Sequence, residues 1–269
     1  MHMYESELEQ LKRWLQELAQ SLTQMRADSS FTIDLKGRND LVTTADLWTE
    51  QELISRLQNQ YPNDSIWAEE TKDEPEDLAG RIWIIDPIDG TTNFAHGFSP
   101  YCISVALWQD DRVVLGMVYE VAHNQCFYAV EHQGAFLNDR PLHVSDISQP
   151  KNALIATGFP YTEFHHVDYF TMLLKDLFQE THGVRRAGAA SYDLCAVAAG
   201  WVDAFFEEGL KPWDVAAGAL IVQEAGGQVS DWNGGNNWLK GKQIIAANSN
   251  LKKYLLHKLS AIYPIETYP

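Results

Sequence analysis

Apolar residues near the N-terminus repeat with the spacing of a helix. They recur at alternating intervals of three and four positions: Leu8, Leu11, Leu15, Leu18, Leu22 and Met25. This spacing places one apolar stripe on one face of a helix. The stripe covers fewer than three heptads, too few to favour a coiled coil over packing on a sheet. We therefore predict an amphipathic helix that packs against a sheet.

Apolar runs farther along the chain predict the remaining elements. A polar loop at residues 36–40 precedes a second helix, which we expect from about Asp46 until just before Pro62. The predicted strands lie near residues 65–68, 82–86, 101–109, 112–120 and 125–130, with a hairpin turn at Asp110 and Asp111. The strand Ala153–Thr157 begins a second half, with helices expected near residues 166–179, 191–199, 214–224 and 251–262. This order of elements favours strands layered between helices.

The length of 269 residues permits one large domain or two modest lobes. No internal repeat, low-complexity tract or obvious linker divides the chain. We expect one domain over residues 1–269, with an N-terminal lobe over about residues 1–150 and a C-terminal lobe over about residues 151–269.

The most informative segment begins with the apolar run Ile82–Ile85, which reads as a central strand that stops at Asp86. Pro87 fixes its own φ angle and lacks a backbone donor, so we expect the ladder to end there. Asp89 follows, and Gly90 permits a sharp turn. The segment therefore places two carboxylates at the end of a strand.

The residues after this turn suit the start of a helix. Thr91 and Thr92 are favourable at a helix N-terminus, where backbone N–H groups and the helix dipole attract phosphate. The Ile88 carbonyl and the two carboxylates are hard oxygen ligands of the kind that Mg²⁺ prefers. On its own, a sequence of the type D-P-x-D-G, as at Asp86–Gly90, usually forms only a turn.

Two other segments also carry acidic residues at element boundaries. Glu69 and Glu70 follow the short apolar segment Trp67–Ala68. Asp214 opens an apolar helix that ends at residues 225–227. One such acid is usually a helix cap, but three segments that each deliver an acid predict a metal site.

With these residues the chain resembles the inositol monophosphatase family of metal-dependent, lithium-sensitive phosphatases. The family motifs D-P-[I/L]-D-G-T-x-x-F and W-D-x-x-A-[A/G] match Asp86–Phe94 and Trp213–Gly218. Supporting matches lie at Asp40–Asp46, Glu69–Glu70 and Gly188–Leu194. The likeness covers roughly residues 8–260. It implies an α/β fold, a layered αβαβα sandwich of the inositol monophosphatase and fructose-1,6-bisphosphatase type.

The resemblance implies two bound Mg²⁺ ions, or three, held by oxygen ligands. Asp86 would bridge two ions, and Glu69 and the Ile88 carbonyl would complete the shell of the first. Asp89 and Asp214 would complete the shell of the second. Two-metal phosphatases hold their ions about 3.5–4 Å apart. The alternative for Asp214 is a simple helix N-cap.

Glu69, Thr91 and Asp46 are the predicted catalytic group. Glu69 and Thr91 would orient the attacking water and take its proton. Asp46 would accept the hydroxyl proton of Thr91, and it is also a plausible cap of the second helix. Glu70 is either a supporting residue or a ligand of an additional ion.

The predicted substrate-binding residues are Gly90, Thr91, Thr92, Ala190, Glu207 and Asp214. The first three would offer backbone N–H and hydroxyl groups to the phosphate, and the resemblance assigns the others to the polyol. Ala189 stands where many relatives carry Ser or Thr, which argues against strict inositol specificity. Arg185 and Arg186 could reach a second phosphate, although an exposed arginine pair is more often solvated. Lys36 and His96 could line the entrance, and each alone is more often structural.

Composition excludes several classes of protein. The net charge of −17 argues against a nucleic-acid surface, whereas bound Mg²⁺ would invert the field around clustered carboxylates. No apolar run approaches the ~20 residues of a membrane span, and no N-terminal segment resembles an export signal. Cys102, Cys126 and Cys195 are an odd number in apolar surroundings and fit reduced thiols of a cytoplasmic protein.

The sequence therefore predicts a Mg²⁺-dependent phosphomonoesterase for a small polyol or sugar phosphate, inositol 1-phosphate first among them. The alternative enzyme is a broader phosphatase that also accepts fructose 1,6-bisphosphate or the 2′-phosphate of NADP. A non-catalytic protein-interaction module on the same fold is the alternative from another class, but all four acidic ligands are intact. A two-metal nuclease is disfavoured because the chain lacks a basic stripe. The resemblance also implies a homodimer.

Overall fold

The computed structural model of the protein describes residues 4–37, 40–71, 75, 78–160 and 164–263. Its helices are α1 (Glu5–Asp28), α2 (Thr44–Gln60), α3 (Thr91–His96), α4 (Val167–Glu180), α5 (Ala190–Ala198), α6 (Pro212–Glu224) and α7 (Ser249–Ile262), with a 3₁₀ turn, η1, at Pro150–Asn152. The helices that the sequence predicts are all present, with ends that differ by only a few residues.

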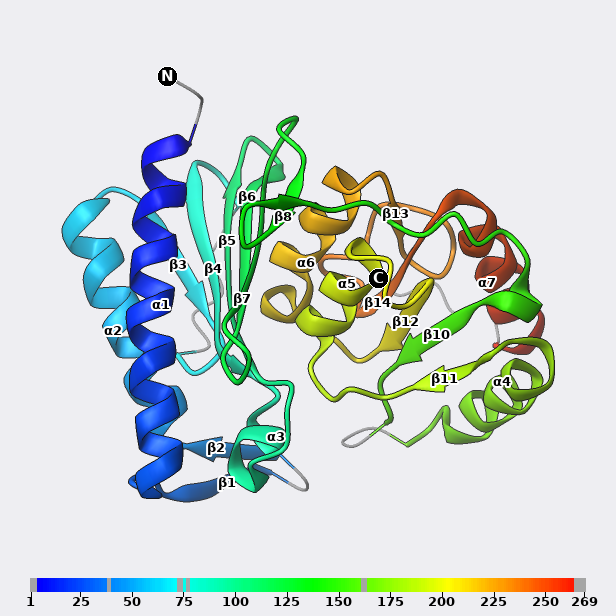
Figure 1. Ribbon diagram of the computed structural model, residues 1–269, viewed down its shortest axis with the longest axis horizontal. Coiled ribbons are helices and arrows are strands. Elements are labelled where there is room, and N and C mark those ends of the chain that lie inside the picture. Colours follow the sequence, from blue (N-terminus) through cyan, green and yellow to red (C-terminus); the bar gives the residue numbers. More distant parts are fainter. Residues whose placement is uncertain (1–3, 38–39, 72–74, 76–77, 161–163, 264–269) are drawn as a thin grey trace.

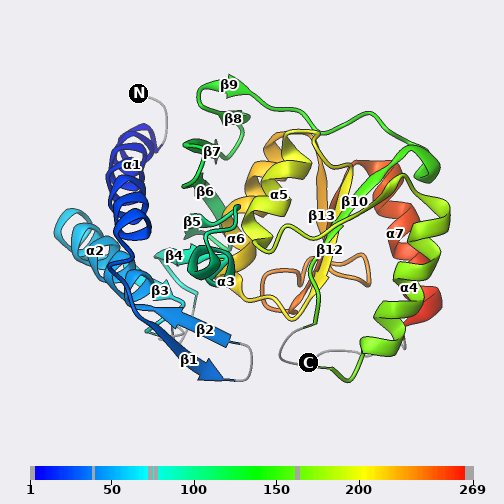
Figure 2. The same ribbon diagram turned by 60° about the horizontal axis from the view of Figure 1, so that its bottom comes forward.

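Helices and sheets alternate in five layers (Figure 1). Helices α1 and α2 cover one face of a larger sheet, and α5 and α6 lie between this sheet and a smaller one, as Figure 2 also shows. Helices α4 and α7 cover the outer face of the smaller sheet. The predicted αβαβα sandwich is confirmed. Among the described residues, none of the helices is long and apolar enough to cross a membrane.

The larger sheet has seven strands. In spatial order they are β3 (Ser65–Ala68), β4 (Arg81–Asp89), β5 (Cys102–Gln109), β6 (Arg112–Glu120), β7 (Gln125–Val130), β8 (Ala135–Leu137) and β9 (Arg140–Pro141). β3 runs parallel to β4, and the other neighbours are antiparallel. The strands predicted from the apolar runs are confirmed, whereas β8 and β9 are too short to show a periodicity in the sequence.

The smaller sheet has five strands, and a separate hairpin follows α1. The sheet order is β11 (Gly183–Arg185), β10 (Leu154–Thr157), β12 (Ala204–Glu208), β14 (Gln243–Ala247) and β13 (Gln228–Ser230), and the hairpin pairs β1 (Ile33–Gly37) with β2 (Asp40–Thr43). The polar loop predicted at residues 36–40 is therefore partly wrong, because Gly37 pairs with Asp40 across the hairpin. Residues 38 and 39 lie outside the described residues. The division into two lobes near residue 150 stays a prediction.

Strand β4 extends farther than its sequence predicts. The ladder does not stop at Asp86, since Asp86 pairs with Ser104 and Asp89 pairs with Cys102. One extra residue on β4 between these pairs makes a bulge. Pro87 lies in this bulge, where its missing N–H costs no ladder bond. The bulge keeps Asp86 and Asp89 on one strand and turns their side chains toward the same site.

Helix α6 packs unusually close to the larger sheet. A Cβ atom on Gly116 of β6 would lie 2.7 Å from the Ala217 carbonyl oxygen of α6, closer than side chains allow. Ser104 of β5 donates a hydrogen bond of 3.2 Å to the Trp213 carbonyl oxygen. These two contacts hold the N-terminus of α6, and with it Asp214, over the ends of β4 and β5.

Candidate active site

The predicted acidic residues converge at the ends of β3 and β4 and the first turn of α6. Glu69 and Asp214 line a cavity of about 570 Å³, together with Lys36 and Glu207. Asp86 and Asp89 are 2% and 9% exposed. Segments that lie far apart in the sequence therefore supply one group of buried carboxylates.

Asp86 is the most demanding member of this group. Its Oδ1 atom is buried and has no hydrogen-bond partner among the described residues. Burial raises the pKa of Asp86 well above its usual value, and the carboxylates of Glu69, Asp89 and Asp214 raise it further. A buried carboxylate without compensation is costly. Because bound cations would remove that cost, the carboxylates and the Ile88 carbonyl fit a magnesium centre.

Glu69 and Glu70 lie against the side chain of Lys36. The Lys36 Nζ atom is 2.9 Å from Glu69 Oε1 and 2.5 Å from Glu70 Oε1. Burial raises the pKa of Glu69, although Lys36 opposes the shift. Lys36 is therefore part of the site rather than a solvated surface residue.

Glu50 of α2 is a supporting residue that the sequence analysis missed. Its carboxylate accepts hydrogen bonds from the backbone N–H groups of Glu70 (2.8 Å) and Thr71 (3.0 Å). Burial raises the pKa of Glu50 to about 7. The only signal in the sequence is an acid at helical spacing from Leu53 and Leu57, on a buried face that also carries Asp46 and Thr49, and this spacing does not reveal what Glu50 contacts.

Asp46 and Thr91 are in direct contact, as predicted. The Thr91 hydroxyl lies 2.9 Å from Asp46 Oδ1 and 3.0 Å from the Ile88 carbonyl oxygen. Asp46 Oδ2 accepts from the backbone N–H and the hydroxyl of Thr43, the N-cap of α2. Asp46 therefore stabilises the helix start and contacts Thr91 at once. Burial raises its pKa to about 6.

Asp89 joins β4 to the N-terminus of α5. Its carboxylate accepts from the backbone N–H groups of Ala190 (3.3 Å) and Ser191 (2.7 Å), and from the Ser191 hydroxyl (2.5 Å). Burial raises the pKa of Asp89, and these donors and Arg186 oppose the shift. Ser191 was missed, although a serine in the first turn of a helix is a common donor there.

Asp214 is not the N-cap of α6. The helix begins at Pro212 with Lys211 as N-cap, and Asp214 Oδ2 accepts a 2.7 Å hydrogen bond from the Lys211 backbone N–H. The alternative interpretation of Asp214 as the N-cap is therefore wrong, because Lys211 occupies that position. Burial raises the pKa of Asp214 well above its usual value, and repulsion from Asp89 and Glu69 raises it further.

Two glycines have close neighbours in the predicted substrate region. Gly90 has a φ angle of 90°, and a Cβ atom there would lie 3.2 Å from the Gly188 carbonyl oxygen and 3.2 Å from Ala189 Cβ. Gly158 faces Glu207 so closely that a Cβ atom would collide with the carboxylate. Burial raises the pKa of Glu207 well above its usual value. Gly90 therefore needs glycine for its backbone angle, whereas a side chain at Gly158 would displace the Glu207 carboxylate.

Arg185, Thr92 and His96 are exposed and do not line the cavity. Arg185 is exposed and donates to the adjacent Val184 carbonyl, so the structure does not bring it to the site. The neighbouring Arg186 is the closer arginine, since its charge lowers the pKa of Asp89. Thr92 and His96 are exposed on α3.

Comparison with known proteins identifies the fold. The model of the inositol monophosphatase family matches residues 4–263. The chain belongs to this family. A protein named Putative Nus factor SuhB from Neisseria meningitidis is 45% identical over 228 residues, covering 85% of this chain and 87% of that protein.

Two solved structures share the architecture. The extragenic suppressor protein suhB from Bartonella henselae is 34% identical, with a TM-score of 0.88, covering 95% of this chain and 98% of that one. The Thermotoga maritima IMPase TM1415 is 30% identical, with a TM-score of 0.84, covering 96% and 98%. The family supports phosphatase chemistry in general, whereas the names of the SuhB relatives leave the catalytic role of this member open.

The raised pKa values predict how Mg²⁺ and pH act together on stability. Unfolded carboxyl groups lose their protons near about pH 4, but the buried acids keep theirs to higher pH. The metal-free protein therefore loses stability as pH rises. Since Mg²⁺ binds deprotonated carboxylates, we expect it to raise the melting temperature more at about pH 8 than at about pH 5.

Thermal denaturation with Mg²⁺ or with EDTA measures this difference. Asp86→Asn is the test variant, in which the effect of Mg²⁺ should shrink. Asp110→Asn is the control, because Asp110 lies in an exposed hairpin turn away from the acidic group. Equal shifts at both pH values would contradict the linkage.

Proposed function

We propose that the protein is a Mg²⁺-dependent phosphomonoesterase of small polyol or sugar phosphates, inositol 1-phosphate first among them. The observation that carries the proposal is the unpartnered Asp86 Oδ1 atom within a buried group of acids. Such a concentration of negative charge favours the binding of cations. Bound cations would in turn neutralise the charge of a phosphate substrate. The adjoining cavity of about 570 Å³ has room for a small ligand.

The ligand assignment follows the positions of the acids. Asp86, Glu69 and the Ile88 carbonyl would hold one ion, and Asp86, Asp89 and Asp214 the other. Bound Mg²⁺ ions supply positive charge that makes water more acidic and stabilises the phosphoryl and leaving oxygens. Glu70, beside Lys36, would support this group or help to bind a third ion.

The proton acceptors come from Glu69, Thr91 and Asp46. The Thr91 hydroxyl has one hydrogen, and donation to Asp46 Oδ1 at 2.9 Å leaves its oxygen lone pairs for a water molecule. Glu69 would orient the same water and take its proton. The raised pKa of Asp46, about 6, makes it a better acceptor near neutral pH.

Substrate binding would use both sides of the Gly90 turn. The backbone of Gly90, Thr91 and Thr92 would face the phosphate, and Glu207, Asp214 and Ala190 the polyol. Fructose 1,6-bisphosphate and the 2′-phosphate of NADP are the alternative substrates. Turnover measured across these three substrate classes, with Arg186→Gln beside the native protein, would show whether a second phosphate is recognised.

A role like that of the SuhB relatives is the second candidate. Relatives 45% identical to this chain carry the name Nus factor. The net charge of −17 disfavours direct contact with nucleic acid, so such a role would rest on a protein partner. An Asp86→Asn protein that lacks turnover yet replaces the native protein in cells would favour this candidate.

We also infer a cytoplasmic location from the unpaired cysteines.

Removal of metal or of Asp86 tests the proposed activity. Asp86→Asn should abolish turnover with the fold retained, because the remaining ligands no longer bridge two ions. Chelation should inactivate the native protein, and added Mg²⁺ should restore it; lithium should inhibit it. Phosphate release is the measurement, with Asp110→Asn as the active control. Substantial turnover by Asp86→Asn or by the chelated protein would refute a two-metal mechanism.

Thr91→Ala separates proton transfer from metal binding. Loss of a positioned proton-transfer partner should lower kcat by roughly 10²–10⁴-fold. The Mg²⁺ concentration for half-maximal activity should change little, because no proposed side-chain ligand is removed. Glu69→Gln should damage both quantities. Thr171→Ala is the control, since its hydroxyl bonds only within α4. A normal kcat for Thr91→Ala would leave Thr91 as an ordinary helix residue.

We propose a homodimer on the basis of the family. Phe159 and Phe164 are 47% and 42% exposed and offer apolar surface. Light scattering at micromolar concentration should give about twice the chain mass of 30.5 kDa. A monomeric mass would count against the dimer without affecting the proposed chemistry.

A further inference from the structure

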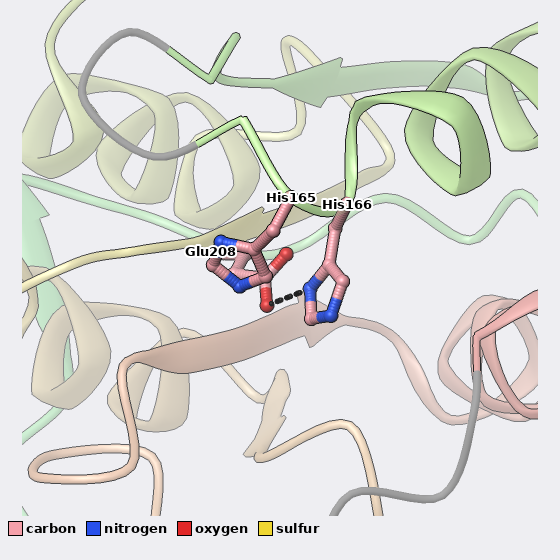
Figure 3. Close-up of side chains that lie close together, drawn as sticks. All are labelled: His165, His166 and Glu208. Carbon is pink, nitrogen blue, oxygen red and sulfur yellow. Dashed lines mark hydrogen bonds and ion pairs between the residues drawn. The ribbon is translucent and has the colours of Figure 1, made fainter.

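A second group of metal-type ligands lines the same cavity. It consists of His165, His166 and Glu208, whose ligand atoms all lie within 4.8 Å of one another. Figure 3 shows the three side chains pointing toward one another. All three line the cavity that also contains Glu69 and Asp214. None of them belongs to the acidic group described above.

The three residues are held by different elements. His165 and His166 directly precede α4, and Glu208 is the last residue of β12. The His166 Nδ1 atom lies 2.9 Å from Glu208 Oε1, and the two imidazole rings have centroids 4.1 Å apart. The side chains of His166 and Glu208 are only 12% and 23% exposed. His165 is exposed, so the cluster is a corner of the cavity that is enclosed at His166 and Glu208 and open at His165.

Neighbouring side chains orient the cluster. Gln243 of β14 donates a 3.3 Å hydrogen bond to Glu208 Oε1, and its strand pairs with β12 at Glu208. The His166 ring packs edge-on against Tyr263 and lies beside Tyr169. Metal sites depend on outer partners of this kind, because they orient the ligands.

The donor atoms select a different metal from the acidic group. Two imidazole nitrogens and one carboxylate oxygen are ligands that suit Zn²⁺ and related transition metals. The acidic group offers oxygen only, which suits Mg²⁺. We propose that His165, His166 and Glu208 bind a zinc-class ion on the wall of the cavity. The ion would place positive charge on the wall of the cavity that Glu207 also lines.

Zinc binding to the full chain in excess Mg²⁺ tests the proposal, with a chromophoric chelator as competitor. Native protein should bind one equivalent of Zn²⁺ that the Mg²⁺ does not displace. His166→Asn and Glu208→Gln should each weaken this binding by at least about 10–100-fold, the loss expected even for an outer partner. Circular dichroism and the melting temperature would check that both variants are folded.

His123→Asn is the matched control, because it also removes a histidine that pairs with a glutamate: His123 Nδ1 lies 3.1 Å from Glu120 Oε2. His123 does not belong to the cluster of His165, His166 and Glu208, which is the only group of this kind among the described residues. It should bind Zn²⁺ like the native protein. Asp86→Asn should also retain the binding, which separates this site from the acidic group and from the proposed activity. Unchanged affinity in His166→Asn and Glu208→Gln would overturn the proposal and leave a hydrogen-bonded cluster.

The absorption spectrum of bound Co²⁺ gives a second measurement on native protein. Imidazole ligation in a site of low coordination number should give intense visible bands. A weak octahedral spectrum, with all binding lost in Asp86→Asn, would show that the ion occupies the acidic group only, and the proposal would fail.

Discussion

Mutual repulsion among buried carboxylates is the constraint on which the rest of the site depends. Burial raises the pKa of Asp86, and the carboxylates of Glu69, Asp89 and Asp214 raise it further. One oxygen of Asp86 has no hydrogen-bond partner among the described residues. Gathering such groups lowers stability, since each buried charge without compensation adds an electrostatic cost. Bound cations would offset this repulsion, and metal binding to such a group would couple folding, metal affinity and pH through these side chains.

The fold offsets part of this repulsion with backbone and side-chain donors. Asp89 receives three hydrogen bonds from the start of α5, and Asp214 receives one from Lys211. Asp46 likewise accepts from Thr43 at the start of α2. Helix N-termini favour negative charge. Asp46, Asp89 and Asp214 therefore each contact the start of a helix, and the packing of α5 and α6 between two sheets brings two of these helix starts together.

The fold was largely predictable because its signals are local. The stripe in α1, the apolar run of β4 and the apolar helix α6 each follow from residues close in sequence. Strands of two or three residues, such as β8, β9 and β11, carry too little periodicity and were not predicted. The strands β12 and β14 were not predicted either, although each has five residues. The bulge at Pro87 was missed for a related reason, because only the pairing with β5 shows that the ladder resumes at Asp89.

The sequence by itself determined which residues are candidates for the chemistry, since Asp86, Asp89, Thr91 and Asp214 stand in ordered motifs with oxygen donors at element ends. Only the tertiary structure decided which groups touch. Three contacts illustrate this. Glu50 contacts Glu70, which is 20 positions away, and Ser191 contacts Asp89, which is 102 positions away. His166 contacts Glu208, which is 42 positions away. Local spacing reports the periodicity of one element, whereas contacts of this kind depend on how separate elements pack, which no short window contains.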